Sequence, residues 1–139
     1  MPFVAVMTGE GKIKKELYDF FFHLNLPVSL STQVFDVAIR IKDKPYAIEL
    51  KMPFVCKRYW GFSLKGVHFG KDQAERQEEI SKVWNIVPVL IIYDHGKFFV
   101  IENYIKKVKE FQNEHGGRDI IPLEVFDNLI PLGKWLRSI

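Results

Sequence analysis

The sequence has one cysteine, and its four histidines are scattered along the chain. Cys56 alone can form neither an intrachain disulfide nor a cysteine-based metal cluster. The histidines lack the spacing of zinc ligands, so we do not expect a zinc site. No apolar run reaches the ~18–20 residues that a membrane span requires, and Met1-Pro2-Phe3 does not begin a signal peptide. We expect a cytoplasmic protein, made in a cell or in a virus-infected microbial host.

The excess of positive over negative charge is also small, because the formal net charge is only +3. This value permits nucleic-acid binding without requiring it. With 139 residues, of which 47% are hydrophobic and 14% aromatic, the chain is expected to be one globular domain with a core. Basic residues nevertheless gather in one aromatic-rich stretch. This stretch is either a loop that contacts DNA or a surface loop that is anchored by its aromatic residues and carries ordinary lysines. The basic residues are Lys57, Arg58, Lys65 and Lys71.

The segment VFDVAIRIKDKPYAIELKM predicts a β-hairpin over about residues 33–52, with a turn at residues 42–45. Placing Ile41 opposite Tyr46 puts Asp36 opposite Lys51, with Glu49 on the same face. A slip of one residue would turn Asp36 toward the apolar side chains, so burial favours the converging arrangement. The hairpin therefore predicts two carboxylates and an ammonium on one face.

Two carboxylates aimed at one point can hold a hard divalent cation such as Mg²⁺. A neighbouring lysine can then contact a phosphate or an attacking water, which outlines a site for phosphodiester hydrolysis. The alternative is a cross-strand Asp/Lys pair that only solvates the outer face of the hairpin, worth ~0.2–1 kcal/mol.

A helix is predicted over residues 9–24, with an apolar stripe centred near Ile13 and Leu17 and continued by Phe20, Phe21 and Leu24. Glu10 lies only ~35° from the centre of this stripe, whereas Glu16 lies ~85° away. An inward glutamate can belong to a site, or it can simply suit the positive end of the helix dipole.

A second helix is predicted over residues 71–85, with a stripe defined by Ile80 and Trp84. The same stripe carries Gln73 and Gln77 upstream, so two amides are expected to face the sheet. They are either buried amides satisfied by backbone groups or groups that orient a phosphate, a water or the lysine. Gln73 is the preferred site residue because it lies nearest the helix start, where backbone N–H groups attract anions.

The remaining segments predict an α/β fold with a mixed sheet flanked by helices. A long loop is expected over residues 53–70, an edge strand over 2–7, and strands over 87–93 and 98–102. A helix follows over 104–113, then a strand over 120–126 and a short helix near 132–137. The apolar tail is expected to be core rather than a dimer surface, and its members are Ile130, Leu132, Trp135, Leu136 and Ile139.

The element order and the D…ELK pattern resemble the PD-(D/E)XK nuclease superfamily over about residues 9–101. Within it, the likeness is greatest to archaeal Holliday junction resolvase-like endonucleases. GEGKIKKELYDFF is similar to their first helix, and NIVPVLIIYD resembles their strand after the second helix. The resemblance implies a restriction-endonuclease-like mixed sheet in a single nuclease-like domain, residues 1–139.

The resemblance also implies roles for individual residues. Asp36 and Glu49 would ligate Mg²⁺ or Mn²⁺ with the Leu50 backbone carbonyl, and Lys51 would position or deprotonate the attacking water.

The first-helix glutamate of the family would correspond to Glu10, with Glu16 in reserve, although an ungapped match falls nearer Lys14. Gln73 is more similar to the helix glutamine of RecB-like or VRR nucleases than to resolvases.

The implied function is a metal-dependent DNA endonuclease, including the case of a structure-selective Holliday junction resolvase. The implied partners are DNA, branched DNA included, and a second copy of the chain, with no membrane. The alternatives are a flap, single-strand or restriction-type nuclease, or a nucleic-acid-binding module without catalysis.

Overall fold

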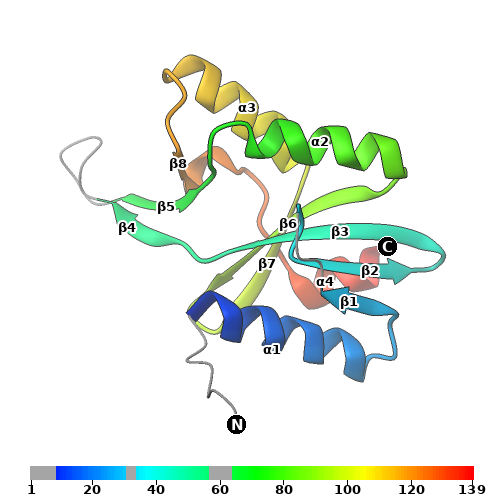
Figure 1. The fold of residues 1–139 in the computed structure, drawn as a ribbon. Helices are drawn as coiled ribbons and strands as arrows, with labels where there is room; N and C mark the ends of the chain where they lie inside the picture. The colour runs from blue at the N-terminus through cyan, green and yellow to red at the C-terminus, as the bar shows by residue number, and fades with distance from the viewer. Residues whose placement is uncertain (1–8, 31–33, 57–63) are drawn as a thin grey trace, which may run out of the picture.

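The computed structural model describes residues 9–30, 34–56 and 64–139. A six-stranded sheet runs through the middle of the molecule, in the order β1-β2-β3-β6-β7-β9 (Figure 1). Neighbouring strands are antiparallel except for the parallel pair β3 and β6. The expected mixed sheet is therefore confirmed. Its strands are β1 (Val28–Leu30), β2 (Val37–Ile41), β3 (Lys44–Lys51), β6 (Val87–Asp94), β7 (Lys97–Glu102) and β9 (Ile130–Pro131).

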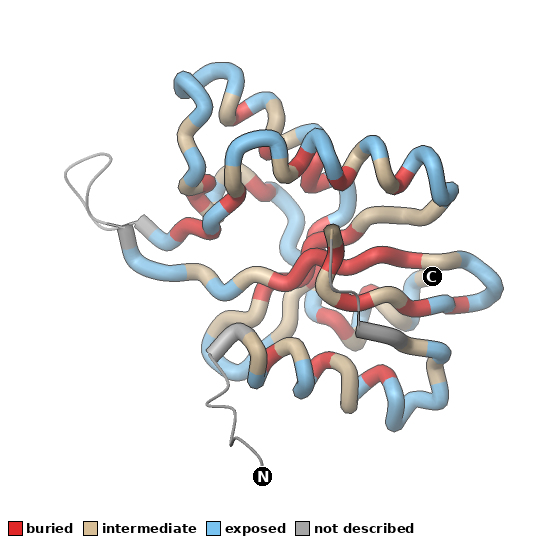
Figure 2. The backbone as a smooth tube through the Cα atoms, viewed as in Figure 1, coloured by how far each residue is buried: buried red, intermediate tan, exposed pale blue. Residues whose placement is uncertain are grey.

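Helices cover both faces of this sheet, α1 (Gly9–His23) and α4 (Leu132–Ser138) on one side and α2 (Gln73–Trp84) and α3 (Tyr104–Glu114) on the other (Figure 1). Strand β6 alternates its side chains between the two resulting cores, with Val89 and Ile91 in one and Leu90 and Ile92 in the other. This explains its uninterrupted apolar sequence. The most deeply buried backbone follows these central strands (Figure 2). None of the described helices has the length and apolar character to cross a membrane.

Helix α1 packs on the sheet along a narrower stripe than the sequence suggests. Ile13, Leu17 and Phe21 are buried, but Phe20 and Leu24 are 38% and 48% exposed. Phe20 lies on the flank of the inward direction, and Leu24 follows the last helical residue, so helical spacing no longer sets its direction.

The inward face of α2 is small and polar, consisting of Ala74, Gln77 and Ser81. The expected stripe through Trp84 is wrong, because that side chain is 70% exposed. Hydrophobic periodicity identifies an inward face by its apolar residues, so it misplaces a face that carries an amide and a hydroxyl. The inward direction of Gln77 is confirmed, because its side chain is fully buried.

The hairpin between β2 and β3 turns within two residues. Lys42 and Asp43 have φ values of 49° and 64°, as a type I′ turn requires, and Ile41 pairs with Lys44. The predicted four-residue turn and the pairing of Ile41 with Tyr46 are therefore wrong by two positions. Because side chains alternate with a period of two, the shift leaves every residue on its predicted face.

The segment expected to be a long loop forms strands instead. β4 (Phe54–Cys56) and β5 (Leu64–His68) pair with β8 (Ile120–Pro122) in a second, three-stranded sheet. Gly66 allows this pairing, because a Cβ atom there would lie 2.9 Å from Ile120 Cγ2 and 3.0 Å from the Ile121 carbonyl oxygen. Residues 57–63 lie outside the described part of the chain, and so does the strand expected over residues 2–7.

The C-terminal tail belongs to the core, as expected. Leu132 and Trp135 of α4 are buried, and the Trp135 ring meets Tyr46 edge-on with a centroid distance of 5.3 Å. The strand expected over residues 120–126 is shorter and continues as a 3₁₀ helix, Leu123–Val125.

Candidate active site

Asp36, Glu49 and Lys51 lie together where β3 ends and β2 begins. Val37 pairs with Ile48, so the next position along the hairpin places Asp36 beside Glu49 rather than opposite Lys51. The Leu50 N–H donates to Asp36 Oδ2 at 2.8 Å, and Lys51 Nζ lies 3.5 Å from Glu49 Oε2. The structure thus brings the three predicted residues of the hairpin to one point.

Glu49 is a carboxylate held inside the protein, only 5% exposed. Gln77 Nε2 donates to Glu49 Oε1 at 2.7 Å and to the Val34 carbonyl oxygen at 3.0 Å. On the other side of the amide, the Tyr104 hydroxyl donates to Gln77 Oε1 at 2.5 Å. An amide oxygen only accepts, so this bond turns the Gln77 NH₂ group toward the carboxylate.

Burial raises the pKa of Glu49 to about 8, and the neighbouring charge of Asp36 adds to the effect, while Lys51 and Gln77 oppose it. A buried carboxylate next to a second carboxylate favours the uptake of a proton or a cation. Burial, followed by the charges of Glu49 and Asp36, raises the pKa of Tyr104 well above 10. Tyr104 therefore remains a hydrogen-bond donor to Gln77.

Lys51 is restrained by groups at the start of α2. Its Nζ lies 3.5 Å from Gln73 Oε1 and 4.7 Å from the centre of the Phe69 ring. The same Gln73 oxygen accepts a hydrogen bond from the Gly70 N–H at 3.0 Å. Gln73 is therefore placed beside the lysine, whereas Gln77 is placed beside the glutamate.

A second ammonium reaches the site from α1. Lys14 Nζ lies 3.3 Å from Asp36 Oδ1. The glutamates considered for this helix are not placed in the same way, because Glu16 is exposed and the side chain of Glu10 lies outside the described residues. Among the described residues, Lys14 and Tyr104 also lie at the site, and the sequence analysis proposed a site role for neither.

The predicted basic residues are only partly described. Lys65 on β5 is exposed and its Nζ lies 3.0 Å from Asp94 Oδ2, and Lys71 is exposed just before α2. Lys57 and Arg58 lie outside the described residues.

The donor set fits Mg²⁺ or Mn²⁺, which prefer oxygen ligands. Asp36, Glu49 and the Leu50 backbone carbonyl are the groups that could hold such an ion, and its charge would replace the proton that Glu49 otherwise retains. Within the described ranges, no cluster of three or more His, Cys, Asp or Glu side chains is suited to a metal. Mg²⁺ usually retains several waters, so two carboxylates and one carbonyl would be a sufficient set of protein ligands.

No protein-family model matches the chain, and no curated protein matches it. Among solved structures, the Holliday junction resolvase Hjc of the archaeal hyperthermophile Archaeoglobus fulgidus is similar with a TM-score of 0.62 and 9% identity. That match covers 90% of this chain and 98% of Hjc. The fusellovirus nuclease D212 matches with a TM-score of 0.43 and 13% identity, over 99% of this chain and 93% of D212. The chain therefore shares the fold of Hjc, in agreement with the expected mixed sheet flanked by helices.

Proposed function

We propose that the protein is a divalent-metal-dependent endonuclease that hydrolyses DNA phosphodiester bonds. The observation that carries the proposal is the buried Glu49, which lies beside Asp36 and Lys51 at the end of β3. A buried carboxylate beside a part-buried carboxylate and a lysine has no evident structural purpose, because apolar side chains would fill the same space at lower desolvation cost.

Each residue has a chemical task in this proposal. Asp36 and Glu49, with the Leu50 carbonyl, hold Mg²⁺ or Mn²⁺, which supplies positive charge for the negative charge that develops on the phosphate oxygens. Lys51 orients or deprotonates the attacking water and offsets phosphate charge. Gln73 restrains Lys51 at 3.5 Å, and Gln77 fixes the Glu49 carboxylate at 2.7 Å.

The first substrate to test is a four-way DNA junction, because the similar fold of Hjc belongs to a Holliday junction resolvase. Cutting two strands of a junction requires two sites, which a homodimer would supply. Lys65 and Lys71, with Lys57 and Arg58, are proposed to contact DNA phosphates.

The test compares cleavage of a four-way junction, a flap, a single strand and a duplex in Mg²⁺, Mn²⁺, Ca²⁺ and EDTA. We expect cleavage in Mg²⁺ or Mn²⁺ and none in EDTA. Asp36→Asn should remove cleavage, whereas Asp43→Asn, in the exposed turn of the same hairpin, should retain it.

Two results would contradict different parts of the proposal. If the junction is cut no faster than the other substrates, the resolvase specificity is wrong. If the protein binds DNA but cuts none of the substrates in any metal, it is a binding module and the proposed catalysis is wrong.

A further inference from the structure

Lys14 holds one side of Asp36 while the protein backbone holds the other. Ile13 and Leu17 are buried and fix α1 against the sheet, which brings Lys14 Nζ to 3.3 Å from Asp36 Oδ1. The Leu50 N–H already donates to the second oxygen, Oδ2, at 2.8 Å. Lys14 Nζ therefore lies next to Oδ1, the oxygen of Asp36 opposite the one that the backbone holds.

The ammonium of Lys14 lies where the site meets the solvent. Its side chain is 29% exposed, compared with 13% for Lys51, which is restrained by Gln73 and Phe69. An anionic polymer that approaches from solvent can therefore meet Lys14 with less desolvation than Lys51. A lysine is suited to this contact because it binds phosphate as a flexible point charge.

A divalent ion held by Asp36 would share that carboxylate with Lys14. Two cations at one carboxylate repel each other, and this repulsion weakens the binding of each. A phosphate between them would relieve the repulsion, because it adds negative charge to the same place.

We propose that Lys14 is a phosphate-binding residue of the active site and that it competes with the divalent ion for Asp36. The inference rests on the metal binding and DNA binding of the proposed function and not on cleavage, because the phosphate is taken to be a phosphodiester of the bound nucleic acid. It assigns two opposite effects to one side chain: Lys14 weakens metal binding and strengthens DNA binding.

A purely structural ion pair would behave differently. If Lys14 only anchored α1 to the sheet, its loss would lower stability and would weaken metal and DNA binding together. The two explanations therefore predict opposite signs for the change in metal affinity.

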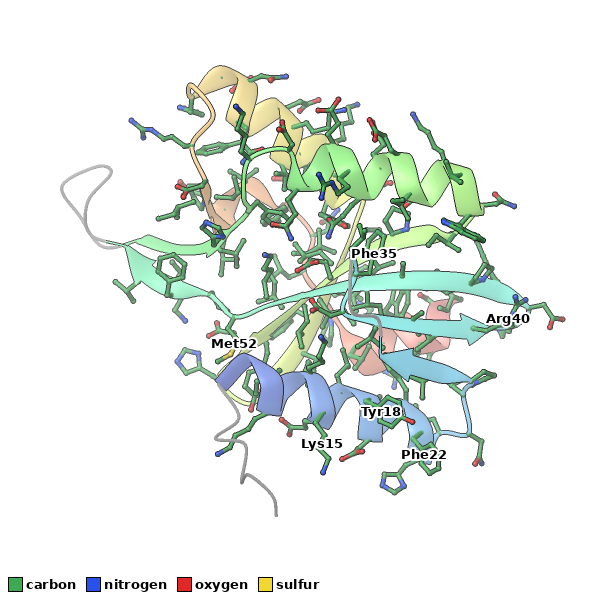
Figure 3. The ribbon with its side chains drawn as sticks, in the orientation of Figure 1. Lys15, Tyr18, Phe22, Phe35, Arg40 and Met52 are labelled. Atoms are coloured by element: carbon green, nitrogen blue, oxygen red, sulfur yellow. The ribbon has the colours of Figure 1, made fainter. Side chains whose placement is uncertain are left out.

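The experiment uses Lys14→Met, which keeps the aliphatic stem, and Lys15→Met as the matched control. Lys15 lies on the same helix but is exposed and points away from the sheet (Figure 3). Mn²⁺ affinity is measured without DNA by calorimetry. Affinity for the junction is measured in Ca²⁺ over a salt series, with recovery of intact DNA as a check.

We expect Lys14→Met to tighten Mn²⁺ binding about two- to fivefold, the upper part of the range for a part-exposed ion pair. The same change should weaken DNA binding and lower the salt slope by about 1, because one phosphate contact is lost. Lys15→Met should leave Mn²⁺ affinity within about twofold and the salt slope unchanged. Lys14→Arg should bind DNA with an affinity close to that of wild type, since it retains the positive charge.

The inference would be overturned if Lys14→Met and Lys15→Met had the same Mn²⁺ affinity and the same DNA affinity. It would also be overturned if Lys14→Met bound Mn²⁺ more weakly than wild type while unfolding at the wild-type temperature. If Lys14→Met does not fold, Lys14→Gln is measured against the same two outcomes. Both affinities are obtained without any cleavage, so a wild type that cuts no DNA would overturn the proposed function and not this inference.

Discussion

Glu49 links the ionisation of the site to the stability of the fold. Its pKa is raised to about 8 in the folded protein, from 4.5 in the unfolded chain. The folded state therefore retains a proton that the unfolded state releases, and the contribution of Glu49 to stability is complete below about pH 4.5 and is lost as the pH rises through about 8.

We predict that Glu49→Gln becomes more stable relative to wild type as the pH increases from 5 to 8.5 in EDTA. The amide cannot ionise, so it avoids the cost of a buried charge beside Asp36. Thermal unfolding at each pH measures the difference. A constant difference between the two proteins across this range would show that Glu49 is already ionised at pH 5.

Lys51 should affect cleavage without being needed for metal binding. Lys51→Met is expected to reduce cleavage by about 10²–10⁴-fold, as for the loss of a positioned acid–base group. It should not weaken Mn²⁺ binding, because it removes a cation 3.5 Å from Glu49 Oε2. Parallel cleavage and calorimetry measure both effects. A loss of metal affinity as large as that of Asp36→Asn would contradict this separation of roles.

Tyr104 is a positioning residue that acts on Glu49 through Gln77. Tyr104→Phe leaves the Gln77 oxygen without its 2.5 Å donor in a buried place, which should cost about 1–3 kcal/mol of stability. The Gln77 amide would then no longer be held in place against Glu49, so Mn²⁺ binding should also weaken. Tyr93→Phe is the control, since Tyr93 is half-buried against Phe98 at a centroid distance of 5.0 Å and is expected to cost about 0.5 kcal/mol or less. Equal losses of stability and of Mn²⁺ affinity in Tyr104→Phe and Tyr93→Phe would show that Tyr104 does not position Glu49.

The site residues differ in how far the sequence could predict them. Asp36, Glu49 and Lys51 follow from the alternation of side chains along two strands, which needs no tertiary information. Tyr104 lies on α3, 55 residues after Glu49 in the chain. No local pattern distinguishes a tyrosine that bonds to a distant glutamine from one that only fills the core.

At the level of elements, the turn of the hairpin fixes which residues meet. Lys42 and Asp43 both have positive φ, a conformation that costs residues with a Cβ atom and that Asn-Gly adopts readily. The geometry of the turn, rather than the hydrophobic pattern, distinguishes registers two residues apart. The hydrophobic pattern is identical in both, so the sequence analysis could not separate them.

We predict that replacing Lys42-Asp43 by Asn-Gly stabilises the protein by about 0.5–1 kcal/mol, because the relief of a positive-φ cost of about 1–2 kcal/mol exceeds the entropy cost of glycine, about 0.5–1 kcal/mol. The turn is exposed and far along the hairpin from Asp36, so Mn²⁺ affinity should not change. Urea denaturation measures the effect. Lys44→Gly, in β3 beyond the turn, is the control and should destabilise. Destabilisation by Asn-Gly would contradict the two-residue turn.

At the level of the whole molecule, α4 completes the core on the side of the sheet opposite α2. Trp135 is fully buried, in contact with Tyr46 of β3. Trp135→Ala should therefore cost about 3–5 kcal/mol. Leu129→Ala, at a residue 36% exposed, should cost much less. Thermal unfolding compares them, and similar losses would show that α4 is not part of the core.

The two-residue turn also has a consequence for the evolution of this hairpin. A change in hairpin length by an even number of residues keeps Asp36 and Glu49 on one face, whereas an odd change separates them unless a bulge compensates. Related chains can therefore differ in the number of residues between the two carboxylates and still conserve the site. Parity is the constraint on this stretch of sequence, and an alignment that fixes the spacing instead would miss true relatives.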